Sequence, residues 1–290
     1  MSVPNDSKAV RRQYATDEAL KTRQAIHDKY TVPKVSYADW VLDSVAWRGD
    51  EVVLDIGSAS GPYYQPLMAR AAEARYVALD YSAGMLQKNN AQYRVQGDGQ
   101  QLPFREDVFD VVMANHMLYH LEDIEAAIKE FRRVLKPGGL LMVATNSTQS
   151  MPELQVLMRR AILLLARAGT TQIQPPTPAS DRFALENGTR YLARHFYAVM
   201  RHDLPSKLIF PEIDPIMDYL ESTRTLREPQ LPEGVAWDDV MMIMRQQIAH
   251  LINHLGELVI TKLVGVLIAT DNGGFIQQFT DIKGAVGVTE

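Results

Sequence analysis

The sequence predicts an α/β fold with a mostly parallel, doubly wound sheet of seven strands and helices on both faces. The first observation is the largely apolar, β-branched run 52–56, which is typical of a strand buried on both sides. The second is the stretch 57–61 that follows, where two glycines let the backbone turn sharply. The third is that, between residues 51 and 146, short apolar runs alternate with segments of helical period.

Composition narrows the classes of protein to consider. The chain has 290 residues, 46% of them hydrophobic, which suits a large globular domain or a domain with a cap. Its net charge of −5 argues against a nucleic-acid-binding surface. The absence of cysteine excludes disulfides, thiolate metal sites and a thiol nucleophile.

Two features bear on location. The N-terminus is polar and of mixed charge, so no signal peptide is expected. The late apolar run Leu258 to Ala269 contains Lys262 and is too short to span a bilayer. We therefore expect a soluble, cytoplasmic protein without a membrane span.

The first glycine-containing turn is a candidate ligand site. The turn ends at Pro62, a favourable first residue for a helix, and ligands of open α/β sheets bind where such a strand ends. A phosphate-binding loop would need Gly-Lys-Ser/Thr, which is missing here. A dinucleotide fingerprint would need G-x-G-x-x-G, whereas Gly57 and Gly61 are separated by three residues.

Polar residues follow the next strands at regular places. Asp80 ends the predicted strand Tyr76–Asp80, roughly 20 residues after the glycine turn, where a carboxylate can accept hydrogen bonds from ribose hydroxyls. A nicotinamide cofactor would use the same geometry. Gly97-Asp98 is followed by Leu102-Pro103-Phe104, and the buried run 108–114 is followed by the polar stretch 115–121. A helix is predicted over 122–135, stopped by Pro137-Gly138-Gly139, before a strand over 140–145.

Residues 51–146 resemble the class I S-adenosylmethionine-dependent methyltransferases. The resemblance rests on the glycine turn with Asp55 two places before Gly57, on the Gly-Asp segment followed by Leu-Pro-Phe, and on the run from Phe109 through Gly139 to Leu141. It implies a Rossmann-like fold and S-adenosyl-L-methionine as cofactor, with S-adenosyl-L-homocysteine as product. It also implies these cofactor-binding residues: Asp55, Gly57, Ser58, Gly61, Asp80, Tyr81, Met85, Asp98, Gly99, Gln100 and Asn115.

The function that the resemblance implies is methyl transfer to an oxygen, nitrogen or carbon nucleophile of a small, partly apolar metabolite. No nucleic-acid partner is expected, because the Asn-Pro-Pro-Tyr type of motif is missing. Two alternatives remain: an NAD-dependent oxidoreductase, and a non-catalytic S-adenosylmethionine-binding partner or regulatory protein. The acceptor and the oligomeric state stay open.

Three residues after the fourth strand are candidates for catalysis: His116, Tyr119 and His120. Histidine titrates near neutral pH, so it can take a proton from a phenol, carboxylic acid or amine. The alternative is that these are ordinary core residues. No metal is expected, because His116 and Tyr119 replace the acids that some relatives use with a metal. His250 and His254 have a zinc-compatible spacing but lack the motif's glutamate and a third ligand.

The expected domain organisation has four parts. Residues 1–47 form an N-terminal helical lid and 48–150 the cofactor-binding core. Residues 151–258 form a helical cap, interleaved at about 185–210 with the end of the core, and 259–290 form C-terminal strands that complete the sheet. Candidate substrate-binding residues in the lid and cap are His27, Tyr30, Met241 and Met244, with ordinary packing as the alternative.

Overall fold

A computed structural model describes residues 18–166 and 174–274, and it divides the chain into two compact units. We call Val35–Thr148, Arg182–Leu204 and Val264–Glu290 the sheet unit, and Met1–Lys34, Gln149–Asp181 and Pro205–Leu263 the helical unit. Each unit is discontinuous in sequence. The division into a lid and a cap stays a prediction. Residues 1–17 of the expected lid and residues 275–290 of the expected C-terminal strands lie outside the described ranges.

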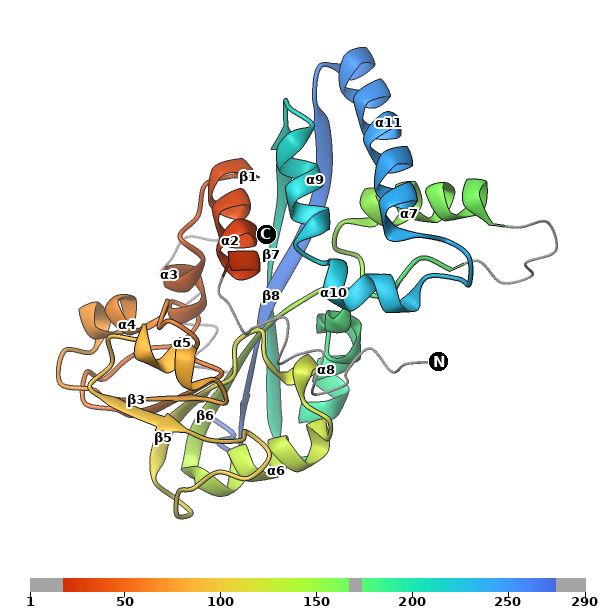
Figure 1. Cartoon of the computed structure of the whole chain (residues 1–290). Helices are drawn as coiled ribbons and strands as arrows, with labels where there is room; N and C mark the ends of the chain where they lie inside the picture. Colours follow the sequence, from red (N-terminus) through yellow and green to blue (C-terminus); the bar gives the residue numbers. More distant parts are fainter. Residues whose placement is uncertain (1–17, 167–173, 275–290) are drawn as a thin grey trace. The chain divides into compact units, whose positions relative to one another are not determined.

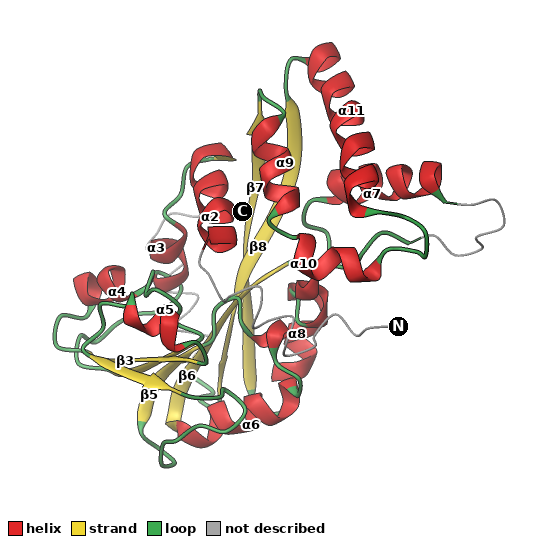
Figure 2. Cartoon of the chain, in the orientation of Figure 1, coloured by secondary structure: helices red, strands yellow, loops and turns green. Residues whose placement is uncertain are grey.

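The sheet has eight strands in the order β1-β7-β8-β6-β5-β2-β3-β4, one more than expected. The additional strand is β1, a two-residue segment that pairs with β7 in antiparallel fashion. Strands β2 to β6 are joined by parallel pairings, and β8 runs antiparallel to β6. The predicted α/β class is thus confirmed (Figure 2). The strands are β1 Thr31–Val32, β2 Val52–Ile56, β3 Arg75–Asp80, β4 Tyr93–Gln96, β5 Phe109–Met113, β6 Leu135–Asn146, β7 Ala198–Phe210 and β8 Leu258–Thr270.

Helices cover both faces of the sheet unit. On one face, α3 and α4 pack against Val53 of β2 and Val266 of β8 in one apolar cluster. The next residue of β8, Leu267, points to the opposite face because side chains alternate along a strand, and there it contacts Gly188 of α8. The helices of this unit are α3 Tyr37–Leu42, α4 Tyr64–Arg70, α5 Ala83–Gln87, α6 Ile124–Val134 and α8 Leu185–Leu192, with the 3₁₀ turn η1 Leu118–His120.

The helical unit has its own apolar core. It gathers Ile26 of α2, Trp237 and Met244 of α11, and Phe210 at the end of β7, all buried. Helices α7 and α11 pack against each other, as do α2 and α9 (Figure 1). The helices are α2 Glu18–Tyr30, α7 Pro152–Leu165, α9 Asp214–Glu221, α10 Arg224–Arg227 and α11 Trp237–Leu255, with the 3₁₀ turn η3 Glu228–Gln230. Another 3₁₀ turn, η2 Ala179–Arg182, lies at the boundary: Arg182 is the first residue of the sheet unit's second segment.

Strand β6 begins earlier than the sequence predicts. The Pro137-Gly138-Gly139 stretch, expected to end a helix, lies inside β6 rather than before it. The ladder between β5 and β6 shifts register between Phe109 and Val111, and Gly138 has φ +75°, so the extra residues are absorbed as an irregularity. The residues expected to stop the helix therefore belong to the first part of strand β6.

Strands β7 and β8 are longer than predicted and continue from one unit into the other. The sequence predicts a sixth strand over 197–204 and a seventh over 265–270; the sixth extends to Phe210, and the seventh begins at Leu258. The turn at 271–274 is described, whereas the strand expected over 275–279 lies outside the described residues. No helix within residues 18–166 and 174–274 combines the length and the apolar character needed to cross a membrane.

Two glycines provide a test of packing in the sheet unit. A Cβ at Gly188 would lie 2.6 Å from Leu267 Cδ1 and 3.0 Å from Phe183, whereas a Cβ at Gly84 of α5 would meet only Ser82 Oγ at 3.8 Å. Gly188→Ala is therefore expected to lower the free energy of unfolding by about 1–3 kcal/mol through overpacking. The control Gly84→Ala should raise it by about 0.4–1 kcal/mol, because alanine restricts the unfolded chain. Urea unfolding measures both, and an unchanged midpoint for Gly188→Ala would contradict this packing.

Candidate functional site

The predicted cofactor residues gather at one edge of the sheet unit. Strands β5, β2 and β3 are parallel neighbours, so their carboxyl ends point the same way. The two strands that follow β2 in the chain, β3 and β4, lie on one side of β2, and the next strand, β5, lies on the other. The edge beside β2 is therefore a topological switch point, where ligands of open α/β sheets bind.

The turn after β2 depends on glycine. Gly57 and Gly61 have φ +68° and +84°. A Cβ at Gly57 would lie 2.7 Å from Met117 Cβ, and one at Gly61 would lie 2.7 Å from Asn89 Oδ1. The N–H groups of Gly57 and Ser58 both donate to the Leu79 carbonyl, at 2.8 and 3.1 Å. The turn is thus held against the end of β3, with no room for larger residues.

Asp80 joins the same turn to the end of β3. Its Oδ2 accepts a hydrogen bond from the Ala59 N–H at 2.9 Å, and its Oδ1 accepts one from the Ser82 N–H at 2.8 Å. Burial raises the pKa of the Asp80 carboxyl, although these backbone donors act in the opposite direction. A carboxylate has about four lone-pair sites, so Asp80 can accept further hydrogen bonds from a ligand.

The segment after β4 forms a compact turn around Asp98. Asp98 Oδ1 accepts from the Gln100 N–H at 2.8 Å, and Gln100 Oε1 accepts from the Asp123 N–H at the start of α6. Gly99 is buried, and a Cβ there would lie 3.3 Å from both Ile56 and Met117. This places Asp98 and the glycine turn in one neighbourhood.

The remaining cofactor candidates differ in exposure. Tyr81, directly after β3, is 51% exposed, whereas Met85 of α5 is 4% exposed. Ser58 is buried, and its hydroxyl accepts from Asn89 Nδ2 at 3.3 Å. A flat aromatic ring at the surface of the site suits stacking, while Met85 belongs to the packing behind it.

Asp55 is enclosed rather than open to a ligand. It is 1% exposed, and its Oδ2 accepts a hydrogen bond from the Tyr76 hydroxyl. Burial raises the pKa of Asp55 to about 7, and the Tyr76 hydrogen bond only partly opposes this. The carboxyl group therefore lies behind the turn, where it anchors strand β2 to β3.

The predicted catalytic segment leaves the end of β5. His116 has φ +54°, a left-handed conformation that is uncommon for a residue with a side chain, and its N–H donates to the Ala144 carbonyl at 2.8 Å. Asn115 is 8% exposed, and its Oδ1 accepts from the Ala144 N–H at 2.9 Å. Within the described residues, the Asn115 Nδ2 atom has no hydrogen-bond acceptor. This amide is a buried donor at the switch point.

Two residues that the sequence did not indicate hold this segment. The Tyr37 hydroxyl of α3 lies 2.8 Å from His116 Nε2, and burial raises the pKa of Tyr37 well above its ordinary value. Arg182 donates to the backbone carbonyls of Tyr119, Leu121 and Glu122 at 3.0, 2.7 and 3.1 Å. Both come from segments outside residues 51–146, and nothing in their local sequence marks them.

Tyr119 and His120 lie in the turn η1 that Arg182 holds. Tyr119 is 9% exposed, and its ring meets the His120 ring edge-on at 4.5 Å. The structure thus brings the three catalytic candidates onto one short segment, with His116 nearest the start. Their roles stay predictions.

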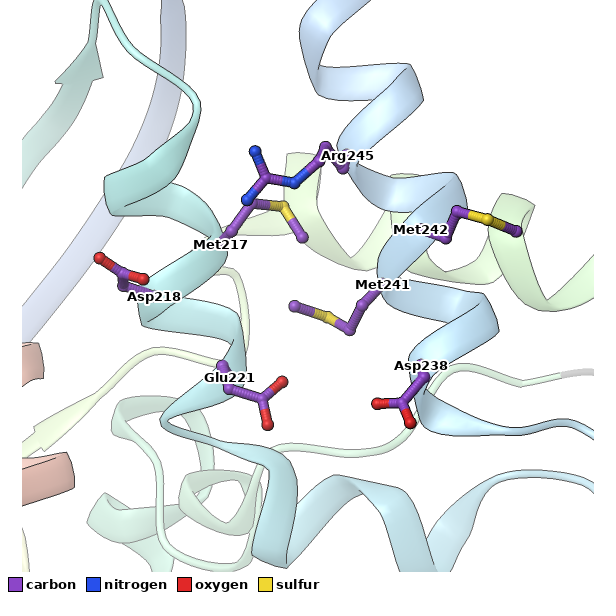
Figure 3. A pocket seen from close by; sticks show the side chains of 7 residues that line it. All are labelled: Met217, Asp218, Glu221, Asp238, Met241, Met242 and Arg245. Carbon is purple, nitrogen blue, oxygen red and sulfur yellow. The ribbon is translucent and has the colours of Figure 1, made fainter.

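The four substrate-binding candidates all belong to the helical unit. Met244 is fully buried in the core, Tyr30 packs against Phe210, and the His27 ring meets Tyr219 edge-on at 5.7 Å. Met241 lines a pocket of about 420 Å³ between α9 and α11. In Figure 3 its side chain points into this space, with the carboxylates of Glu221 and Asp238 at one end and Arg245 at the other. The lining residues are Met217, Asp218, Glu221, Asp238, Met241, Met242 and Arg245.

No group of three metal-ligating side chains occurs in the part of the chain that the structure describes. His250 and His254 lie on α11 with their rings stacked, centroids 5.5 Å apart. Two histidines without a third ligand do not make a zinc site.

Comparison with known proteins agrees with this geometry. Residues 54–143, all within the sheet unit, match a family model described as a methyltransferase domain. The demethylmenaquinone methyltransferase of Corynebacterium glutamicum strain R is 38% identical over 117 residues, covering 40% of this chain and 50% of the relative. The malonyl-[acyl-carrier protein] O-methyltransferase 1 of Coxiella burnetii is 30% identical over 144 residues, covering 49% and 51%.

Solved structures share the fold. A putative methyltransferase from Bacillus halodurans superposes with a TM-score of 0.52 at 16% identity, covering 82% of this chain and 99% of that one. One from an antibiotic biosynthesis pathway of Anabaena variabilis gives 0.56 at 14% identity, covering 82% and 98%.

Residues 54–143 are therefore similar to methyltransferase domains, in agreement with the resemblance that the sequence motifs indicated. The matched region is residues 54–143, and the chain spans about half the length of the curated relatives it matches.

Asp55 offers a test through pH. Its folded-state pKa of about 7 lies above the unfolded value of about 3.9. The contribution of this group to stability is therefore full below pH 4 and is lost as pH rises to about 7, at about 1.4 kcal/mol per pKa unit. Asp55→Asn keeps an acceptor for Tyr76 and removes the titration. Urea unfolding at pH 5 and pH 8 should show a smaller loss of stability for the variant than for the wild type; equal losses would contradict the burial of a titrating Asp55.

Proposed function

We propose that the protein is a methyltransferase that uses S-adenosyl-L-methionine and methylates an oxygen, nitrogen or carbon atom of a small, partly apolar molecule. The observation that carries this proposal is the junction of the glycine turn with Asp80, where the Ala59 N–H meets the carboxylate. A bare backbone beside a carboxylate with spare lone pairs suits a nucleoside, whose ribose offers two hydroxyl donors.

The residues present fit such a cofactor. The turn at Gly57 and Gly61 leaves no room for a Cβ, so its backbone can be approached closely. Asp80 would accept hydrogen bonds from the ribose, Asp98 from the adenine amino group, and the exposed ring of Tyr81 would cover the base. The Asn115 Nδ2 donor, buried and without an acceptor among the described residues, would meet a ligand oxygen.

The cofactor supplies a methyl group on a positively charged sulfur, which leaves as a neutral thioether once the methyl has moved. The protein's main task is then to hold the acceptor in line at near-attack distance. Where the acceptor carries a proton, His116 would take it. The Tyr37 hydroxyl oxygen, 2.8 Å from His116 Nε2, would accept a hydrogen bond from Nε2–H, which holds the imidazole in one orientation and places the basic lone pair on Nδ1.

Two alternatives make different binding predictions. An NAD-dependent oxidoreductase would bind NAD, and a non-catalytic partner would bind S-adenosylmethionine without turnover. Calorimetry with S-adenosylmethionine, S-adenosylhomocysteine and NAD distinguishes the oxidoreductase from the proposed methyltransferase. The second is separated by assaying S-adenosylhomocysteine formation with phenols, carboxylic acids, amines, demethylmenaquinone and a malonyl thioester, the last two taken from the relatives' names.

Asp80→Asn tests the cofactor site. Hydrogen bonds to a charged group are worth about 1.5–3 kcal/mol, so affinity for S-adenosylmethionine and S-adenosylhomocysteine should fall about ten- to hundredfold. The control is Asp214→Asn, which alters an exposed carboxylate paired with Arg245 in the helical unit and should leave affinity unchanged. Titration calorimetry measures both. Wild-type affinity in a folded Asp80→Asn variant would rule out this role.

His116→Ala tests the base. For an acceptor that arrives protonated, turnover at pH 7 should fall about 10²–10⁴-fold while cofactor affinity is kept. His250→Ala, on α11 of the helical unit, is the control. Tyr37→Phe should change the pH profile of turnover without removing it, because the imidazole stays but loses its partner. Turnover that is unaltered by His116→Ala across pH 5–9 would exclude His116 as the base.

A further inference from the structure

The helical unit buries a cation, Arg227, that has no carboxylate at ion-pair distance among the described residues. Arg227, the last residue of α10, is 9% exposed. Arginine is rarely buried to this extent unless it is paired, because removing a charge from water is costly. The hydrogen bond that the structure gives its side chain runs from Nη1 to Met158 Sδ at 3.5 Å, and a thioether is a weak acceptor. A guanidinium has five N–H donors, so most of the capacity of Arg227 is unused.

Carboxylates do not compensate this charge at close range. Among the described residues, none lies within 4 Å of the Arg227 guanidinium in an ion pair, and Asp181 attracts it only from farther away. Burial accordingly lowers the pKa of Arg227 below its ordinary value. Arginine side chains stay protonated in proteins at neutral pH, so the group is charged.

Arg224, one helical turn earlier, shows the contrast. Its guanidinium pairs with Glu221, Glu228 and Asp238 at 3.3, 3.0 and 3.0 Å, at the surface. Among the residues that the structure describes, three carboxylates thus pair with the partly exposed Arg224, and none pairs with the buried Arg227 on the same helix. Stabilisation of the fold does not explain this distribution, because an unpaired buried charge destabilises.

A second cation, Arg23, acts on the same tyrosine side chain as Arg227. Arg23 of α2 donates from Nη1 to the Ser222 carbonyl at 2.8 Å. The positive charges of Arg227 and Arg23 both favour the ionised form of the Tyr219 hydroxyl, although burial raises the pKa of Tyr219 overall. The His27 ring lies edge-on against Tyr219. Arg227 and Arg23 thus both lie near enough to Tyr219 for their charges to act on its hydroxyl, and an anion bound beside them would relieve their mutual repulsion.

We propose that Arg227, Arg23 and Tyr219 form a binding site for a small oxyanion, a carboxylate or a phosphate group, in the helical unit. The guanidinium fork of Arg227 suits two oxygen atoms of such a group, Arg23 adds a second positive charge, and the Tyr219 hydroxyl donates a further hydrogen bond. The site goes beyond the proposed methyl transfer, and its test does not depend on turnover.

Thermal unfolding of the full chain tests the site, with sodium phosphate, sodium succinate and sodium chloride compared at equal ionic strength. We expect phosphate or succinate to raise Tm saturably above the chloride baseline, since a ligand that binds only the folded state stabilises it. The arm that responds identifies the anion. Arg227→Met should abolish this rise, and the exposed arginine variant Arg160→Met of α7 should keep it.

A second readout separates a ligand site from a structural arginine. Without added anion, Arg227→Met should be at least as stable as the wild type, because methionine fills the space and removes an unpaired buried charge. If this variant fails to fold, that expectation is wrong, and Arg227→Lys and Arg23→Met then decide by calorimetry with the responding anion. A Kd at least tenfold higher supports the site. No response of the wild type above chloride, or an undiminished response in the Arg227 and Arg23 variants, would overturn it.

Discussion

The sheet unit depends on one backbone constraint, the turn that joins β2 to the end of β3. Two N–H groups of this turn converge on the Leu79 carbonyl, and Gly57 and Gly61 hold left-handed conformations with no space for a side chain. Ala59 is also left-handed, with φ +46°, which is unfavourable for a residue that has a Cβ. Its N–H donates to Asp80, so the hydrogen bond to a carboxylate offsets the conformational cost. The backbone of this turn and the Asp80 carboxylate are thus joined directly by a hydrogen bond.

Burial of polar groups follows the same logic in both units. Asp55 is enclosed, yet the Tyr76 hydroxyl satisfies it, and it holds β2 against β3. In residues 18–166 and 174–274, the enclosed Asn115 amide has a partner for its oxygen but not for its nitrogen, and the enclosed Arg227 has a sulfur atom as its acceptor. Because a buried polar group without a partner costs free energy, satisfied groups are explained by the fold, and unsatisfied ones point to ligands. This difference, rather than burial itself, separates Asp55 from the other two.

The sequence predicted what local pattern determines. The buried run 52–56, the acid at Asp80 and the Gly-Asp segment all lie within the alternating strand and helix pattern, and each ends at the expected edge. Elements set by tertiary contacts were missed. The strand predicted over 197–204 continues through Pro205 to Phe210 as β7. This strand pairs with the short β1 only around Leu208, and a proline without N–H is tolerated beside such an edge.

Site residues show the same division. Tyr37 and Arg182 contact the catalytic segment from positions 79 and more than 60 residues away in the chain, and no periodicity encodes such a contact. Met244 and Met241 are three residues apart on α11, yet one is fully buried and the other lines a pocket. Composition alone cannot separate these outcomes, because a methionine suits an irregular core and an adaptable pocket equally well.

The end of β5 shows how strain and hydrogen bonding together aim a side chain. Asn115 Oδ1 accepts from the Ala144 N–H, and the His116 N–H donates to the Ala144 carbonyl, so both polar groups of one β6 residue clamp two successive residues. A left-handed non-glycine residue costs of order 1 kcal/mol, and this clamp is what sustains it. Without the clamp His116 would relax to an extended conformation, and its imidazole would leave the Tyr37 hydroxyl. The same clamp fixes the Asn115 amide so that its donor, not its acceptor, remains available at the switch point. The conformation of this edge therefore rests on the backbone N–H and carbonyl of Ala144, a β6 residue whose side chain takes no part in these hydrogen bonds.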